Sequence, residues 1–206
     1  MEGPPDNRPA TFTGLTGSVA AGKSEALEAF GRVGAATLST DLVVHDLLES
    51  PDVVATLVER WGDEVAPSGR IDRSQVGSIV FERPEELAWL EKALHPRVAE
   101  AVAQWRDSLP SAVAVAVVEV PLLFEVGMES VFDATICVSA DDRTRKSRAG
   151  DRGTALLDGR TDRQLPQEEK MARATYVIEN DGTLKELETA VAALYDELAS
   201  PDRDAG

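Results

Sequence analysis

The stretch "ATFTGLTGSVAAGKSEALEAFGR", residues 10–32, decides the fold of this chain. Its first part mixes apolar and β-branched residues and ends in glycine, which predicts a buried strand over residues 11–16. Its last part places apolar residues at helical spacing, which predicts a helix from Lys23 to about Arg32. A glycine-rich loop therefore joins a strand to a helix.

The loop matches the pattern G-x-x-x-x-G-K-[ST] through Gly17, Gly22, Lys23 and Ser24. Glycines allow successive N–H groups to turn inward around an anion, and the positive end of the following helix faces the same place. The pattern predicts that Lys23 reaches the β- and γ-phosphates of a nucleotide and that Ser24 ligates Mg²⁺. The loop residues predicted to bind nucleotide are Gly17, Ser18, Val19, Ala20, Ala21, Gly22, Lys23, Ser24 and Glu25.

Further strands alternate with helices along the chain. Apolar runs predict strands over residues 35–40, 112–120, 134–139 and 174–180, and an amphipathic helix follows near the end. This alternation is typical of an α/β fold with a parallel, doubly wound sheet between two helical layers. Between the second and third strands the pattern is helical throughout, which predicts a helical subdomain beside the sheet, with a helix that breaks or kinks at His95-Pro96.

Composition narrows the classes of partner. The chain of 206 residues has a formal net charge of −16, so its field repels nucleic acid and anionic membranes. No apolar run is long enough to span a bilayer, and the N-terminus lacks the pattern of a signal peptide. Cys137 is the single cysteine, which excludes an intrachain disulfide and favours a cytoplasmic location.

One basic cluster stands out against this acidic background. Residues 143–152 hold four arginines and a lysine, "RTRKSRAGDR". Such a run is usually a solvated helix face. A polyanionic ligand such as ATP would, however, require a local concentration of positive charge like this one.

A phosphate loop does not name a reaction, and the chain lacks the N-K-x-D motif of GTP-binding switches. The lengths of the predicted helix and strand after the loop return Asp41 to the loop's edge of the sheet, where such folds bind ligands. Asp41 could accept the proton of a substrate hydroxyl, or it could cap its helix. His45, one turn later, fits a surface histidine better than a substrate contact, and Glu119 could hold a magnesium-bound water or simply cap its strand.

Several stretches together resemble the dephospho-coenzyme A kinase family. They are "GLTGSVAAGKS", "LSTDLVVHDLL", "GRIDRSQVGSIVF", "LEKALHPRV", "EVPLLFEVGM" and "YVIENDGTLKEL", in family order over roughly residues 12–187. The resemblance implies phosphorylation by ATP and Mg²⁺ of the 3′-hydroxyl of dephospho-CoA, the last step of coenzyme A synthesis. It implies a single kinase domain, residues 11–200, between tails at residues 1–10 and 201–206. Its parts would be a core, a helical substrate region and a lid, at residues 11–50, 111–140 and 174–200 for the core, 51–110 for the substrate region and 141–173 for the lid.

The resemblance also assigns site residues. Asp41 matches the proposed catalytic base, and Lys23 and Ser24 match the phosphate and magnesium positions. Asn180 falls in a loop near the nucleotide base. Arg148 and Arg152, with Arg145 behind them, are the candidates for a clamp on the γ-phosphate.

Three positions depart from the family pattern. Glu25 replaces the threonine that usually follows the loop serine, Ser39 replaces the first acid of a D-A-D motif, and the lid carries an extra Gly159. These changes leave two other functions open. One is kinase activity on another small alcohol, such as a nucleoside, and the other is nucleotide binding with little catalysis.

Overall fold

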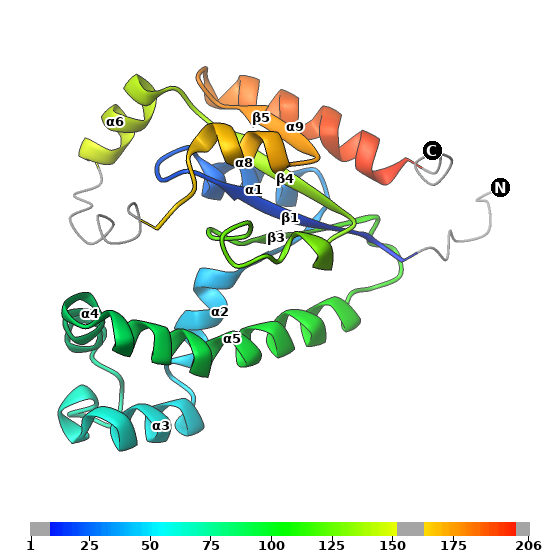
Figure 1. Cartoon of the computed structure of the whole chain (residues 1–206). Coiled ribbons are helices and arrows are strands. Elements are labelled where there is room, and N and C mark those ends of the chain that lie inside the picture. The colour runs from blue at the N-terminus through cyan, green and yellow to red at the C-terminus, as the bar shows by residue number, and fades with distance from the viewer. Residues whose placement is uncertain (1–8, 152–162, 201–206) are drawn as a thin grey trace. The chain divides into compact units, whose positions relative to one another are not determined.

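We describe a computed structural model of the chain, which covers residues 9–151 and 163–200 (Figure 1). Two compact units divide it: Thr40–Ser108 form one, and the residues before Thr40 and after Ser108 form the other. We call them the helical unit and the core unit. The helical unit begins ahead of residue 51, where the substrate region was expected to start.

The core unit contains a five-stranded parallel sheet of order β2-β3-β1-β4-β5. The strands are β1 Thr11–Gly17, β2 Ala36–Ser39, β3 Val115–Glu119, β4 Ala134–Ser139 and β5 Tyr176–Glu179. All five predicted strands are confirmed, although β2, β3 and β5 are shorter than their apolar runs. The fold class, an α/β parallel sheet of the phosphate-loop type, is confirmed.

Helices and loops cover both faces of this sheet. On one face, Leu15, Val117 and Ile136 pack in one cluster with Phe30 of α1 (Lys23–Arg32) and Val191 of α9 (Leu184–Ala199). Successive strand residues point to opposite faces, so Phe12 and Cys137 face the other side. There the Phe12 ring stacks on Phe132, and α8 (Gln167–Arg173) lies against β4. The fourth described α-helix of the core unit is α6, Asp142–Asp151 (Figure 1).

The helical unit consists of α2 Thr40–Leu47, α3 Pro51–Trp61, α4 Arg73–Glu82 and α5 Pro84–Asp107. Two short 3₁₀ turns, Asp63–Val65 in this unit and Glu129–Val131 in the core, complete the described helices. A separate apolar cluster built on Val53, Leu57, Val76 and Leu94 holds the unit together. It therefore has its own small core.

The helix was expected to break or kink at His95-Pro96, and a break there is wrong: α5 runs through Pro96 to Asp107. Proline removes one backbone donor from the helix. The neighbouring turn gains a bond, since Arg97 Nη1 donates to the Ala93 carbonyl at 2.7 Å. Packing of α5 on α2 and α4 then holds the continuous helix.

A buried carboxylate links two helices of this unit. Glu86 accepts hydrogen bonds from Arg60 Nη2 and Nε at 2.8 and 2.9 Å, and from Trp61 Nε1 at 2.8 Å. The hydrogen bonds from Arg60, followed by that from Trp61, lower the pKa of Glu86. Within the part of the chain that the structure describes, no helix is long and apolar enough to cross a membrane.

Candidate active site

The glycine-rich loop lies between β1 and α1 at the carboxyl edge of the sheet, as predicted. A methyl group at Gly17 would collide with the backbone carbonyl of Val138 on β4. Gly22 caps α1 with φ +97°, and Ala20 also has a positive φ, +61°. Positive φ values are unfavourable for residues with a Cβ, which explains the glycine at position 22. The positive φ of Ala20 shows that the loop backbone adopts an uncommon conformation.

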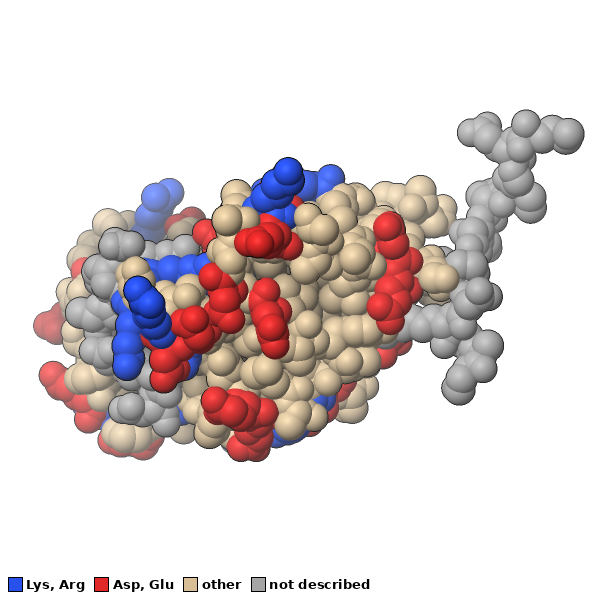
Figure 2. Space-filling view, turned by 90° about the horizontal axis from the view of Figure 1, so that it is seen from above, with Lys and Arg blue, Asp and Glu red and all other residues tan. Residues whose placement is uncertain are grey.

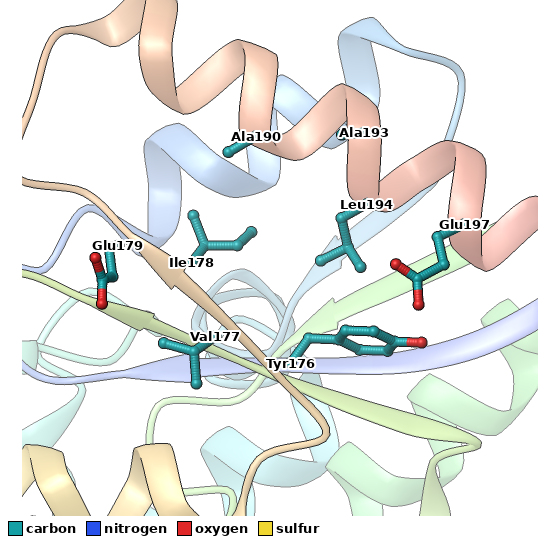
Figure 3. A pocket seen from close by; sticks show the side chains of 8 residues that line it. All are labelled: Tyr176, Val177, Ile178, Glu179, Ala190, Ala193, Leu194 and Glu197. Atoms are coloured by element: carbon teal, nitrogen blue, oxygen red, sulfur yellow. The ribbon is translucent and has the colours of Figure 1, made fainter.

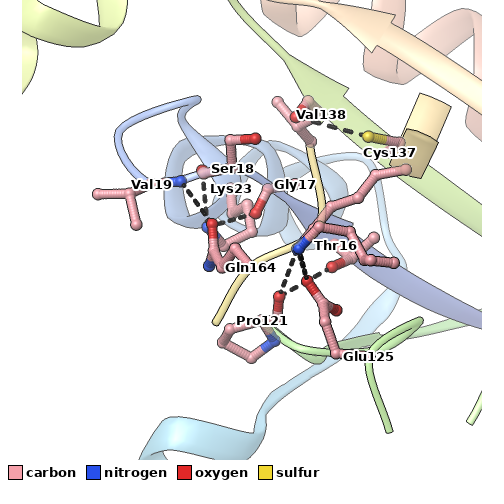
Figure 4. A network of polar contacts seen from close by, with 12 residues as sticks. Thr16, Gly17, Ser18, Val19, Lys23, Pro121, Glu125, Cys137, Val138 and Gln164 are labelled. Carbon is pink, nitrogen blue, oxygen red and sulfur yellow. Dashed lines mark hydrogen bonds and ion pairs between the residues drawn. The ribbon is translucent and has the colours of Figure 1, made fainter. Parts of the chain in front are cut away.

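Lys23 folds back over the loop (Figure 4). Its Nζ donates to the carbonyl of Gly17 at 3.1 Å and to that of Ser18 at 3.0 Å. The ammonium thus lies over the loop itself, at the mouth of the predicted phosphate cradle.

One glutamine and one asparagine, both far from the loop in sequence, bind the loop backbone through their side chains. Gln164 Oε1 accepts from the Val19 N–H at 3.2 Å, and Asn180 Nδ2 donates to the Ala21 carbonyl at 2.9 Å. Asn180 is buried, and a methyl group at Gly22 would collide with its Nδ2. No role was predicted for Gln164, because a glutamine in a polar stretch has no periodicity or spacing that marks it.

A buried ion pair supports the same edge (Figure 4). The fully buried Lys170 lies 2.8 Å from Glu125 and donates to the Pro121 carbonyl at 3.0 Å. Glu125 also accepts from the N–H of Leu165, next to Gln164, at 2.9 Å. Thr16 Oγ1 donates to the same Pro121 carbonyl at 3.2 Å. The loop after β3 is thereby tied both to the end of β1 and to the start of α8.

Of the predicted clamp arginines, Arg148 is the one that the structure places near the phosphate loop. Its Nη1 lies 3.7 Å from the position of a Cβ at Gly22. That nitrogen is buried, and no described residue accepts a hydrogen bond from it. Arg145 is paired instead with Asp142. Arg152 lies outside the described residues.

The first turn of α1 carries the predicted metal ligand. Ser24 is exposed, and Glu25 beside it is half-buried. A carboxylate in the first turn interacts favourably with the helix dipole, which gives Glu25 a stabilising role there. No group of three or more histidine, cysteine or acidic residues suited to a metal occurs among residues 9–151 and 163–200.

The other predicted polar residues follow the ends of neighbouring strands. Ser39 and Glu119 are register partners at the ends of β2 and β3, and Glu119 is buried. Asp41 follows Ser39 by two residues, is exposed and belongs to the first turn of α2 in the helical unit. His45 Nε2 lies 3.8 Å from Glu49 in the turn after α2, a contact typical of a surface histidine.

Cys137 offers no reactive thiol, and its Sγ donates to the Val138 carbonyl at 3.9 Å (Figure 4). It is fully buried in β4, and burial raises the pKa of its thiol to about 11. The thiol is therefore protonated and is no nucleophile at neutral pH.

A groove of about 490 Å³ lies elsewhere in the core unit, between edge strand β5 and α9 (Figure 3). Its lining is largely apolar, with the carboxylates of Glu179 and Glu197 among the lining side chains. These charges repel a triphosphate, so the groove does not compete with the loop as a nucleotide site.

Figure 2 shows carboxylates spread over one face of the molecule, with basic side chains gathered in fewer places.

Comparisons with known proteins agree with this geometry. The family model described as CoaE, dephospho-CoA kinase, matches residues 11–186. A dephospho-CoA kinase of Chlorobaculum tepidum is 36% identical over 196 residues, which cover 91% of this chain and 94% of that protein.

Solved structures show the same fold. A Thermus thermophilus protein, TT1252, superposes with a TM-score of 0.77 at 31% identity, over 93% of this chain and 99% of that one. A dephospho-CoA kinase of Campylobacter jejuni superposes with a TM-score of 0.64 at 23% identity, over 93% of this chain and 98% of the other, and supports the fold alone. With a phosphate loop in its predicted place and a family match over most of its length, the chain belongs to the dephospho-CoA kinase family.

Proposed function

We propose that the protein transfers the γ-phosphoryl group of ATP to the 3′-hydroxyl of dephospho-CoA, giving coenzyme A and ADP. The observation that carries this proposal is the phosphate loop, with its lysine over the cradle and the buried, unpartnered Nη1 of Arg148 beside Gly22. A buried guanidinium N–H without an acceptor is unfavourable, so an anionic ligand at this place completes the site. Family membership supports the choice of acceptor.

The loop binds the triphosphate through backbone N–H groups at the start of α1, because first-turn N–H groups have no acceptor within the helix. Lys23 leaves the Gly17 and Ser18 carbonyls and neutralises the β- and γ-phosphates. Arg148 binds the moving phosphoryl group from the side of α6. Both cations stabilise charge that grows in the transition state.

Asp41 is the proposed base. It accepts the proton of the 3′-hydroxyl as that oxygen forms a bond to the γ-phosphorus, and the bond from the phosphorus to the bridging oxygen of ADP breaks. The exposed hydroxyl of Ser24 fits a ligand of Mg²⁺, which would otherwise be held by phosphate oxygens and water. When bound, the metal would supply positive charge that offsets the charge of the phosphates.

The experiment is transfer of label from γ-labelled ATP by the purified protein. We expect label in coenzyme A and one ADP released per coenzyme A when dephospho-CoA is the acceptor, and little transfer to adenosine or other nucleosides. A better rate with a nucleoside would assign a different acceptor. Binding of ATP without release of ADP in the presence of any acceptor would show a nucleotide-binding protein without this activity.

A further inference from the structure

Asn180 is anchored at both its main chain and its side chain. Its backbone N–H donates to the Ser139 carbonyl at the end of β4, at 2.8 Å. The next residue, Asp181, accepts from the Asp141 N–H at 2.6 Å through Oδ1. The turn after β5 is thus tied to the turn after β4, and the buried amide of Asn180 is held in one place.

From this place the side chain reaches the phosphate loop. Nδ2 donates to the Ala21 carbonyl at 2.9 Å, across 159 positions of sequence, and the bond is buried. Gly22 leaves the space for this approach, because any Cβ there would collide with Nδ2. Two features of the loop therefore accommodate the Asn180 side chain: the Ala21 carbonyl accepts its hydrogen bond, and Gly22 has no side chain to block it.

The bond has a geometric consequence for the loop. A trans peptide unit is planar, and its C=O and N–H point in opposite directions. Holding the Ala21 carbonyl toward Asn180 therefore turns the Gly22 N–H away from Asn180. Without the bond, the glycine at φ +97° allows this peptide to rotate at little cost.

We propose that Asn180 is a positioning residue that orients the Ala21–Gly22 peptide for phosphate binding and does not act through the nucleotide base. The inference rests on the proposed nucleotide site in the loop. Two roles are possible for Asn180, and they predict different affinities. If Asn180 contacts the nucleotide base, its loss weakens only ligands that carry the base. If it orients the peptide, its loss weakens every ligand with a phosphate chain.

The test measures affinities of full-length wild type and Asn180→Ala for MgATP, MgGTP and inorganic tripolyphosphate, by calorimetry and by competition. Loss of one hydrogen bond to the loop is expected to weaken all three by the same factor, about two- to tenfold. Gln167→Ala is the matched control. It removes the hydrogen bond that the Ala140 N–H, just after β4, donates to Gln167 Oε1 at 3.2 Å. It should leave the three affinities unchanged.

Asn180→Asp adds a readout that lost packing does not produce. The carboxylate faces the Ala21 carbonyl, so binding should be weaker than in Asn180→Ala at pH 7.5. Asn180→Ser repeats the measurement if either variant fails to fold.

Weaker MgATP with unchanged tripolyphosphate would overturn the inference in favour of a base contact, and unchanged affinity for all three would overturn it outright. Failure of the proposed function looks different. In that case wild type binds tripolyphosphate, the variants still weaken it, and no label reaches dephospho-CoA.

Discussion

Polar side chains do different work in the core unit and in the helical unit. In the core, Asn180 and Gln164 bind main-chain groups of the phosphate loop from far along the sequence. In the helical unit, Glu86 binds the side chains of Arg60 and Trp61, and Arg60 lies over the Trp89 ring at 5.1 Å. The first kind of contact shapes a binding surface, whereas the second joins two helices.

Substitutions in the two units should therefore affect different measured properties, nucleotide affinity in one case and stability in the other. Contacts to the loop backbone should change nucleotide affinity with little change in stability. Contacts between helix side chains should change stability with little change in phosphate binding. Asp41 is an exception to this division. It lies on α2 of the helical unit, but as the proposed base it should affect the rate of phosphoryl transfer.

The largest expected effect belongs to Asp41. Asp41→Asn should lower kcat by about 10²–10⁴, the usual contribution of a general base, with MgATP affinity unchanged. Steady-state rates and calorimetry check this. Asp46→Asn, an exposed acid on the same helix, is the control. A rate within a few-fold of wild type would leave Asp41 as a helix-capping residue.

Lys23→Ala should lower kcat by about 10²–10³, the range for loss of one group that stabilises the transition state. Thermal unfolding should stay close to that of wild type, because Nζ of Lys23 donates to carbonyls of its own loop, those of Gly17 and Ser18. Lys185→Ala, on the exposed side of α9, should leave both measurements unchanged. A large fall in the unfolding temperature would give Lys23 a structural role and break the comparison.

Glu86→Gln should lower the unfolding temperature by several degrees at pH 7 while tripolyphosphate affinity stays unchanged. The folded-state pKa of Glu86 lies below its ordinary value of 4.5. Its contribution to stability is therefore complete above that value and is lost as the pH falls through the folded pKa. Unfolding temperatures measured from pH 7 to pH 3 should fall less steeply in Glu86→Gln than in wild type. Parallel curves would contradict the assignment.

The smallest effect is expected at Gln164. Its Oε1 occupies the Val19 N–H, which a phosphate oxygen needs if it binds there. Gln164→Ala should therefore bind MgATP about two- to tenfold more tightly, by the worth of one hydrogen bond. Gln167→Ala again serves as control, and weaker binding in Gln164→Ala would mean that Gln164 contacts the nucleotide directly.

Local patterns were enough to predict the parallel sheet, the phosphate loop and the first helix, because apolar periodicity and the spacing of Gly17, Gly22, Lys23 and Ser24 are local properties. Local patterns also predicted the helical subdomain and a break or kink at His95-Pro96. The break is wrong, because a local rule does not include the packing that holds α5 continuous through Pro96.

Which distant side chains contact the loop follows from the tertiary structure and not from local patterns. Gln164 and Asn180 bind backbone groups, and the fully buried Lys170 pairs with Glu125, across separations that no periodicity encodes. The tertiary structure also placed Nη1 of Arg148, a buried nitrogen for which no described residue is an acceptor, 3.7 Å from the position of a Cβ at Gly22. The physical reason is that every residue type offers a backbone carbonyl, and nearly every type a backbone N–H. A hydrogen bond to such a group therefore depends on where the fold places the two partners, and the residue type at that position does not reveal it.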